Sequence, residues 1–91
     1  MAEITRITFA DMTYSFELPT TFSLKRVMIN AEEEMEVYPI INGFNLKSVS
    51  TNIESDVFLE PITNQSIIME IIGFYNRPVS VSSVELWIEL F

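Results

Sequence analysis

The chain of 91 residues contains no cysteine and no histidine. The absence of cysteine excludes disulfide bridges, thiol nucleophiles and zinc sites built on cysteine. The absence of histidine removes the usual general base at neutral pH and the commonest metal ligand in proteins. No serine stands in the Gly-x-Ser-x-Gly context of a serine hydrolase. We therefore predict that the protein is not an enzyme and that it binds no metal and no other cofactor.

Basic residues are scarce, with five against thirteen acidic residues and a formal net charge of −8. Contact with a phosphate backbone requires clustered lysines and arginines because the release of counterions drives it, and here the basic residues are scattered. We therefore predict no direct binding to nucleic acid. The acidity either keeps a chain that is 48% hydrophobic in solution or faces a basic partner.

Glycine and proline are also rare, with two and four residues, so the sequence contains no flexible linker and predicts one domain over residues 1–91. The longest hydrophobic run, around residues 67–72, is far too short to span a bilayer. The first residues lack the basic segment and apolar run of a secretory signal. We expect no membrane association and a cytoplasmic location, or a place in a virion assembled in a host cytoplasm.

What the sequence does have is alternation of apolar and polar residues, which is clearest in residues 79–91. A period of two residues predicts a half-buried strand. Leu86 and Ile88 share its apolar face, and we predict that both lie in the core. Ser82-Ser83 shifts the alternation by one residue, which predicts a β-bulge.

The opposite face of this stretch carries two large aromatic side chains and two carboxylates. These residues are Glu85, Trp87, Glu89 and Phe91. Large aromatic side chains on the nominally exposed side of a strand indicate that another sheet or another chain covers that side. We predict that these four residues contact a protein partner.

Residues 22–38 allow two interpretations. Apolar residues recur at helical spacing between residues 23 and 36, which is compatible with one helix. In that helix Lys25 and Arg26 would lie at the positive end of the helix dipole and the glutamates at the negative end, which is unfavourable. The alternative is a strand at residues 24–30, a glutamate-rich turn, and a strand at residues 35–41. We favour the two strands because the rest of the chain is rich in strand-forming residues.

Short runs of strand-forming residues fill the remainder of the chain. They are residues 4–9 and 12–18, expected to form a hairpin, then 44–53, 56–61 and 66–75, with Asn76-Arg77-Pro78 as a hairpin loop into the last strand. Residues 66–75 are apolar almost throughout, which predicts a central strand covered on both faces and places Ile68 and Ile71 in the core. Pro39 predicts an edge position, and Asn42-Gly43 predicts a turn with positive φ.

About seven to nine short strands with frequent turns predict an all-β, mainly antiparallel fold. We expect a small β-sandwich or barrel. A helix at about residues 23–36 is the alternative for that one segment.

Acidic residues gather at two places. Glu32, Glu33 and Glu34 belong to the glutamate-rich turn and would suit a basic partner, whereas a calcium loop would need a tight turn with glycine, which is missing. Glu54 and Asp56 stand two residues apart, as in a weak divalent-cation site, but solvated carboxylates are the more ordinary interpretation.

We predict a non-enzymatic structural or interaction protein that self-associates or docks into a larger assembly through strand edges and an apolar face. A bacteriophage virion or tail fits this composition. The alternative is an acidic inhibitor that engages the basic nucleic-acid-binding groove of a host enzyme. A second alternative is a small sugar-binding module, since aromatic side chains can stack on sugars, although core packing explains them better. The aromatic residues concerned are Tyr14, Tyr38, Phe74, Tyr75 and Trp87.

Overall fold

The computed structural model describes residues 4–9, 15–18, 20–63 and 66–91. In these residues the fold is all-β and contains no helix. Nine strands follow one another in the described residues. They are β1 (Ile4–Phe9), β2 (Ser15–Glu17), β3 (Phe22–Asn30), β4 (Glu36–Ile41), β5 (Phe44–Asn45), β6 (Val49–Ser50), β7 (Ser55–Ile62), β8 (Ser66–Gly73) and β9 (Ser83–Leu90). None of the described segments forms a helix long and apolar enough to cross a membrane.

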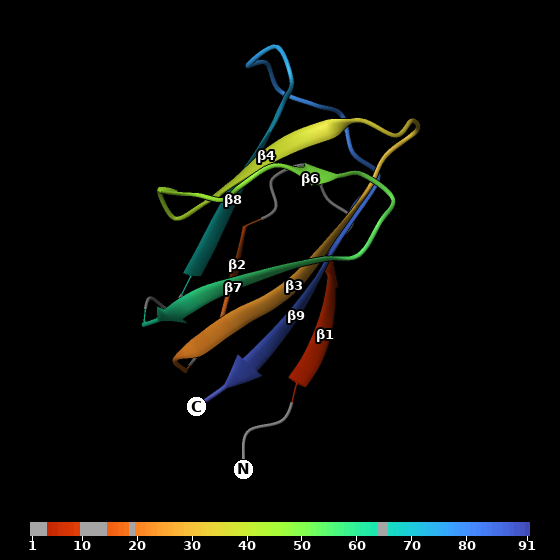
Figure 1. Ribbon diagram of the computed structural model, residues 1–91. Helices are drawn as coiled ribbons and strands as arrows, with labels where there is room; N and C mark the ends of the chain where they lie inside the picture. The colour runs from red at the N-terminus through yellow and green to blue at the C-terminus, as the bar shows by residue number, and fades with distance from the viewer. Residues whose placement is uncertain (1–3, 10–14, 19, 64–65) are drawn as a thin grey trace.

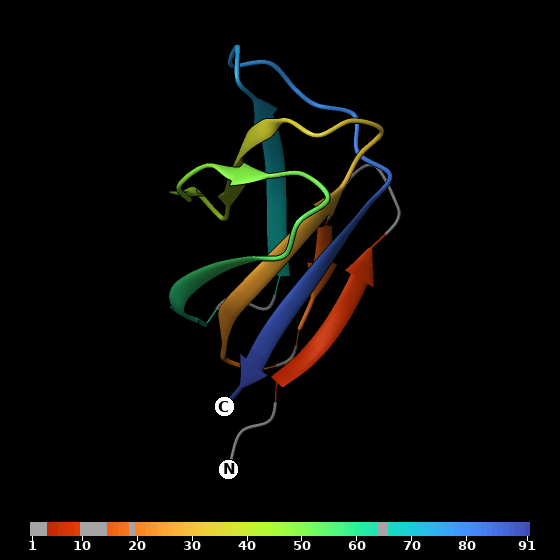
Figure 2. The same cartoon turned by 45° about the vertical axis from the view of Figure 1, so that its right-hand side comes forward.

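The strands form two antiparallel sheets, which confirms the predicted small β-sandwich (Figure 1). The first sheet has the strand order β1-β9-β3-β7. The second sheet has the order β2-β8-β4-β5, and β6 also pairs with β4. In Figure 2, β8 of the second sheet (teal) passes behind β3 of the first sheet (orange).

One hydrophobic core lies between the two sheets. The first sheet and its flanks contribute Phe22, Leu24, Val27, Ile29, Ile62, Val81, Val84, Leu86 and Ile88, and the second sheet contributes Val37, Ile41, Val49, Ile67, Met69 and Ile71. Each fully buried side chain of this size contributes about 1.5–3 kcal/mol relative to its exposed state. The predicted core positions Ile71, Leu86 and Ile88 are confirmed.

Residues 22–41 form two strands, and the alternative of a helix is wrong. Val27 and Ile29 of β3 and Val37 and Ile41 of β4 point into the same core, because alternate residues of a strand share one face. The glutamate-rich turn connects the two strands across the two sheets.

The Asn42-Gly43 turn is confirmed. Both residues have positive φ, 47° and 86°, as a two-residue hairpin turn between β4 and β5 requires. The predicted edge position of Pro39 is wrong, since β4 has strand partners on both sides. Pro39 is accommodated because it lies between the residues that pair with β5 and those that pair with β6.

Two predicted hairpins are wrong for the same reason, which is that consecutive strands belong to different sheets. β1 pairs with β9, whereas β2 pairs with β8. The Asn76-Arg77-Pro78 segment likewise belongs to a crossover from β8 in the second sheet to β9 in the first. Alternation of apolar and polar residues shows that a strand has a buried face. It does not show which sheet the strand belongs to or which sheet packs on that face.

The prediction for residues 66–75 is also wrong in part. β8 has partners on both sides, but burial alternates along it, and Ile68 is 61% exposed. The run at 44–53 is broken into β5 and β6, because residues 46–48 leave the strand. The β-bulge predicted at Ser82-Ser83 is wrong, because β9 begins only at Ser83 and Ser82 precedes the strand. The register shift between β3 and β9 lies instead in β3, between Leu24 and Arg26.

Candidate protein-binding surfaces

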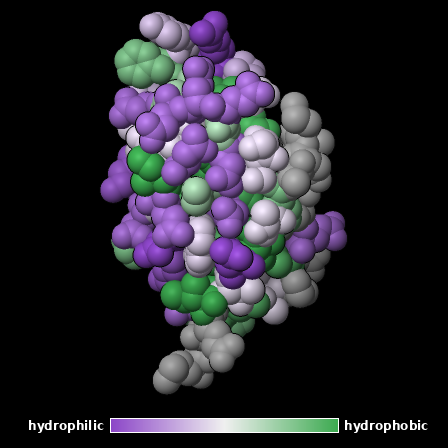
Figure 3. Space-filling view, turned by 90° about the vertical axis from the view of Figure 1, so that its right-hand side faces the viewer, coloured by the Kyte–Doolittle hydropathy of each residue, from purple (hydrophilic) through white to green (hydrophobic). Residues whose placement is uncertain are grey.

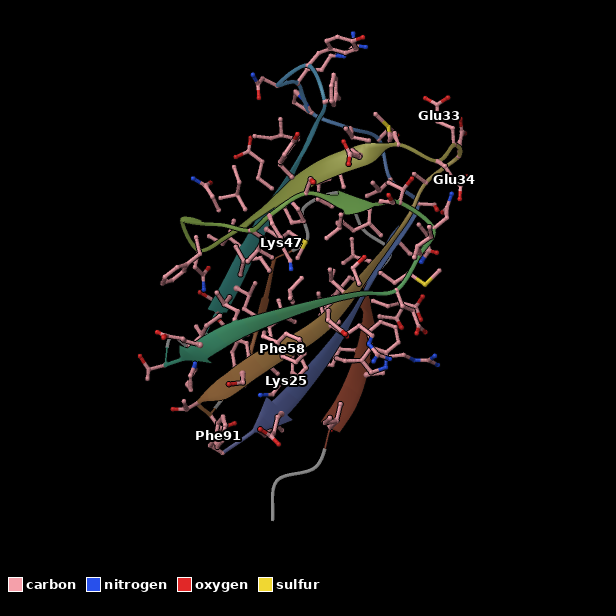
Figure 4. The ribbon with its side chains drawn as sticks, viewed as in Figure 1. Lys25, Glu33, Glu34, Lys47, Phe58 and Phe91 are labelled. Carbon is pink, nitrogen blue, oxygen red and sulfur yellow. The ribbon has the colours of Figure 1, made fainter. Side chains whose placement is uncertain are left out.

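The seven residues predicted to contact a partner fall into two separate groups. Glu85, Trp87 and Glu89 lie along β9 and Phe91 follows them, whereas the three glutamates lie in the turn between β3 and β4. In Figure 4, Glu33 and Glu34 are at one end of the molecule and Phe91 is at the other. The structure therefore offers two candidate surfaces, one on the first sheet and one at the glutamate-rich end.

The first surface is the side of the first sheet that faces away from the core, here called the outer face. Trp87 lies near its centre, because its strand neighbours are Arg6 on β1 and Arg26 on β3. The guanidinium carbon of Arg26 lies 5.9 Å from the centre of the Trp87 ring, within the range of a cation–π contact. Trp87 is therefore half-buried by side chains of its own sheet.

Ion pairs connect the four strands across the outer face. Arg6 pairs with Glu85 at 3.6 Å, and Lys25 pairs with Glu89 at 3.7 Å. Arg26 donates from Nε to Asp56 at 3.0 Å, and its Nη1 lies 3.4 Å from Glu54. Exposed ion pairs such as these contribute about 0–1 kcal/mol each, so their main effect is to fix positions and cancel charge.

Glu54 and Asp56 are thus occupied by a guanidinium. In the described part of the chain, no group of three or more acidic side chains is arranged to hold a metal ion.

A groove of about 370 Å³ crosses the outer face beside Trp87. Its lining consists of Ile4, Lys25, Arg26, Asp56, Phe58 and Trp87. Ile4 and Phe58 are both exposed, and Figure 4 shows Phe58 next to Lys25. Three apolar and three charged side chains therefore line the groove. Protein-binding surfaces also combine apolar side chains, aromatic ones and arginine among them, with polar groups.

The sequence revealed neither Ile4 nor Phe58 as part of this surface, and Phe58 is the more exposed of the two. It lies in β7 with a φ of 49°, and β7 has a register shift against β3 at this point. The irregular backbone turns the phenyl ring outward, where it is 68% exposed. The signal in the sequence is the run Val57-Phe58-Leu59, three apolar residues that break the alternation of the strand.

Charge is almost balanced among the ion-paired residues of the outer face. Its ion pairs involve three of the five basic residues and four of the thirteen acidic ones. Nine acidic and two basic residues take no part in these four pairs, and exposed Glu60 of β7 is one of them. Figure 3 shows the side of the molecule on which β1 lies in Figure 1, where hydrophilic side chains dominate and hydrophobic patches are small and separate.

The second surface, here called the acidic end, is built on the turn between β3 and β4. Buried Thr51 holds this turn, because its Oγ1 accepts a hydrogen bond from the Met35 amide at 2.9 Å and donates to the Glu33 carbonyl at 2.7 Å. The side chain of Asn52 accepts a further bond from the Ala31 amide at 3.0 Å. The exposed glutamates are therefore carried by a fixed backbone.

A second groove, of about 580 Å³, separates this turn from the crossover between β8 and β9. Glu32 and Glu33 line one side, and exposed Phe74 and Tyr75 line the other. The two rings are T-shaped at 5.4 Å, and the Arg77 guanidinium carbon lies 5.5 Å from the Tyr75 ring centre.

Gly73 allows the crossover to pack closely against the turn. A Cβ atom on this residue would lie 2.6 Å from Cγ2 of Val79 and 3.3 Å from Cε of Met35. The geometry of the second groove therefore depends on this glycine.

The aromatic residues considered for sugar binding do not form one surface. Trp87 is on the outer face, whereas Phe74 and Tyr75 are at the acidic end. Core packing, the preferred explanation for these residues, is wrong for Phe74, Tyr75 and Tyr38, which are exposed. Tyr14 lies outside the described residues.

Comparison with protein-family models and with curated proteins gives no match for this chain. A solved structure to which the chain is similar is that of a β-glucosidase from Paenibacillus barengoltzii. The match covers 90% of this chain and 10% of that chain, with 11% sequence identity and a TM-score of 0.45. A likeness at this level supports no conclusion about function.

Proposed function

We propose that this protein is a non-enzymatic structural or interaction protein that docks into a protein assembly through its outer face. The observation that carries the proposal is Phe58, a bulky residue with positive φ whose ring is 68% exposed beside Trp87 and Ile4. A left-handed backbone destabilises a non-glycine residue by roughly 1–2 kcal/mol. In the isolated chain the ring is mostly exposed, so its burial contributes little stabilisation to offset this cost. A partner that covers the ring supplies that stabilisation.

The edges of the first sheet add to this surface. β7 has register shifts and contains Pro61, features that hinder the addition of another strand. β1 pairs with β9 in unbroken register along six residues, so β1 is the regular edge. A partner that reaches beyond the outer face would therefore extend the sheet at β1.

We infer that the setting is a multi-subunit particle, of which a bacteriophage virion or tail is our example. The support is compositional: the chain is β-rich and free of cysteine and histidine. The partners in this proposal are proteins.

Hydroxyl-radical footprinting tests the proposal without knowledge of the partner. The probes are Trp87, Phe58 and Met28, a half-buried residue of β3 that pairs with Glu85 of β9 on the outer face. Their oxidation is measured in the protein's native source and compared with the purified protein at high dilution. We expect protection of these three side chains in the native source, while Phe74 and Tyr75 stay reactive. Equal oxidation of the outer face in both samples would contradict the proposal.

The acidic end supports a second candidate, the acidic inhibitor of a basic nucleic-acid-binding protein. Its support is the fixed turn of exposed glutamates, for which no ion-pair partner exists among the residues that the structure describes. In the same footprinting experiment this candidate predicts the reverse pattern, with Phe74 and Tyr75 protected and Trp87 and Phe58 reactive.

A further inference from the structure

Building on the proposed function, we propose that the partner on the outer face is a second copy of this chain. The two copies dock about a two-fold axis, and Phe58 of each copy enters the groove beside Trp87 of the other. A two-fold contact brings the same patch of both copies together, so the patch must be complementary to itself.

The shape of the outer face meets this condition. The exposed ring of Phe58 stands at one wall of the groove, and Ile4 and Trp87 are part of the same lining. A projecting aromatic ring and an apolar groove thus lie side by side on one surface. Each copy can therefore both fill the other's groove and have its own groove filled.

Charge also favours the outer face for self-association. Two chains with a formal charge of −8 repel each other, and contact through their acidic ends would bring exposed glutamates together. The ion pairs of the outer face join three cationic to four anionic side chains, so the paired residues together carry a charge of only −1. This face is therefore where two copies can approach with little repulsion and with opposite charges available on both sides.

The backbone at Phe58 provides a way to separate association from folding. Asparagine tolerates a positive φ better than phenylalanine does, so Phe58→Asn removes the ring and also relieves the strained backbone. The matched control is Phe44→Asn. Phe44 is 56% exposed, but it lies on β5 of the second sheet, away from the outer face.

The experiment is sedimentation equilibrium of the purified wild type and both variants over a wide range of concentration. We expect a reversible dimer for the wild type, a dimer weakened by at least about tenfold for Phe58→Asn, and less than about a twofold change for Phe44→Asn. Ile4→Ser is a second variant of the groove that should weaken the dimer in the same direction. A thermal melt of Phe58→Asn should show a monomer at least as stable as the wild type.

Salt distinguishes a second copy from a basic partner. Raising the salt from about 0.05 M to about 0.5 M screens the repulsion between the two acidic chains, so the dimer should keep its affinity or gain some. Binding to a basic partner would instead weaken steeply.

Three results would overturn the inference: a wild type that stays monomeric at the highest concentration, a dimer that weakens steeply with salt, or a dimer that both groove variants leave unchanged. The proposed function is judged separately. A monomer in solution whose outer face is nonetheless protected in the native source would exclude the second copy and retain docking to another protein.

Discussion

The outer face and the acidic end are both rich in acidic residues, but they differ in whether these residues form ion pairs. On the outer face Glu85, Glu89 and Asp56 each lie within ion-pair distance of a lysine or arginine. At the acidic end Glu32 and Glu33 lack such a neighbour among the described residues. The carboxylates are therefore neutralised by basic residues of the same sheet in one region. In the other region they remain free to repel other negative charges.

This difference shows that composition alone assigns no role to acidic residues. Glu85 and Glu89 look like partner-binding residues in the sequence, yet the structure pairs them with Arg6 and Lys25 of the same sheet. Their effect is to surround Trp87 and the groove with balanced charge. In the proposed contact the apolar side chains, and not the carboxylates, would be the source of affinity.

The largest expected effect contrasts the two faces of β9. Ile88 is fully buried, so Ile88→Ala should lower the free energy of unfolding by about 2–5 kcal/mol. Urea unfolding measures this loss. Trp87→Ala serves as the comparison, and an equally large loss there would mean that both faces of β9 are core and that the outer face is no docking surface.

Trp87→Ala should act on association instead. Loss of an aromatic ring at the centre of an interface weakens binding by about 2 kcal/mol, or roughly thirtyfold. Sedimentation equilibrium measures the change in the dimer, and circular dichroism checks that the fold is kept. An unchanged dimer of a well-folded Trp87→Ala would place the contact elsewhere.

Gly73→Ala tests whether the two regions are independent. The added methyl group would meet Val79 and Met35, and such overpacking costs about 1–3 kcal/mol. Unfolding should show this loss, while the affinity of the dimer should stay close to that of the wild type. A dimer that weakens in parallel would show that the acidic end contributes to the contact.

The smallest effect on stability is expected from reversing Glu32, Glu33 and Glu34 together to lysine. All three are exposed, and surface substitutions usually change stability by no more than about 0.5 kcal/mol. The reversal reduces the negative charge by six units, so self-association should become slightly tighter. If the acidic end is instead the surface of an inhibitor, the same variant should lose its basic partner entirely.

The sequence predicted the elements of the fold better than their arrangement. Alternation identified the inward face of β9 with Leu86 and Ile88, and the misplaced charges correctly argued against a helix at residues 23–36. The sequence did not predict which of the two sheets each strand belongs to, because the apolar face of a strand has the same pattern whichever sheet covers it. The exposure of Ile68 was not predicted for a related reason. A continuous run of apolar residues does not show which face of the strand is buried in the core.

The candidate surface was predicted only in part. Trp87 was found because an aromatic residue on the polar face of a strand is unusual. Phe58 was missed, because its outward position depends on an irregular backbone that no residue pattern fixes. The division of the acidic residues between paired and unpaired sites required the strand register, which joins residues far apart in the chain.

The most direct test of the outer face as a contact between two copies uses the fluorescence of Trp87, the only tryptophan in the chain. Its quenching by acrylamide is measured as the protein concentration rises, with Phe58→Asn beside the wild type. We predict that quenching of the wild type falls with concentration as the second copy covers the ring, and that quenching of Phe58→Asn stays high. Quenching of the wild type that is the same at all concentrations would contradict the account.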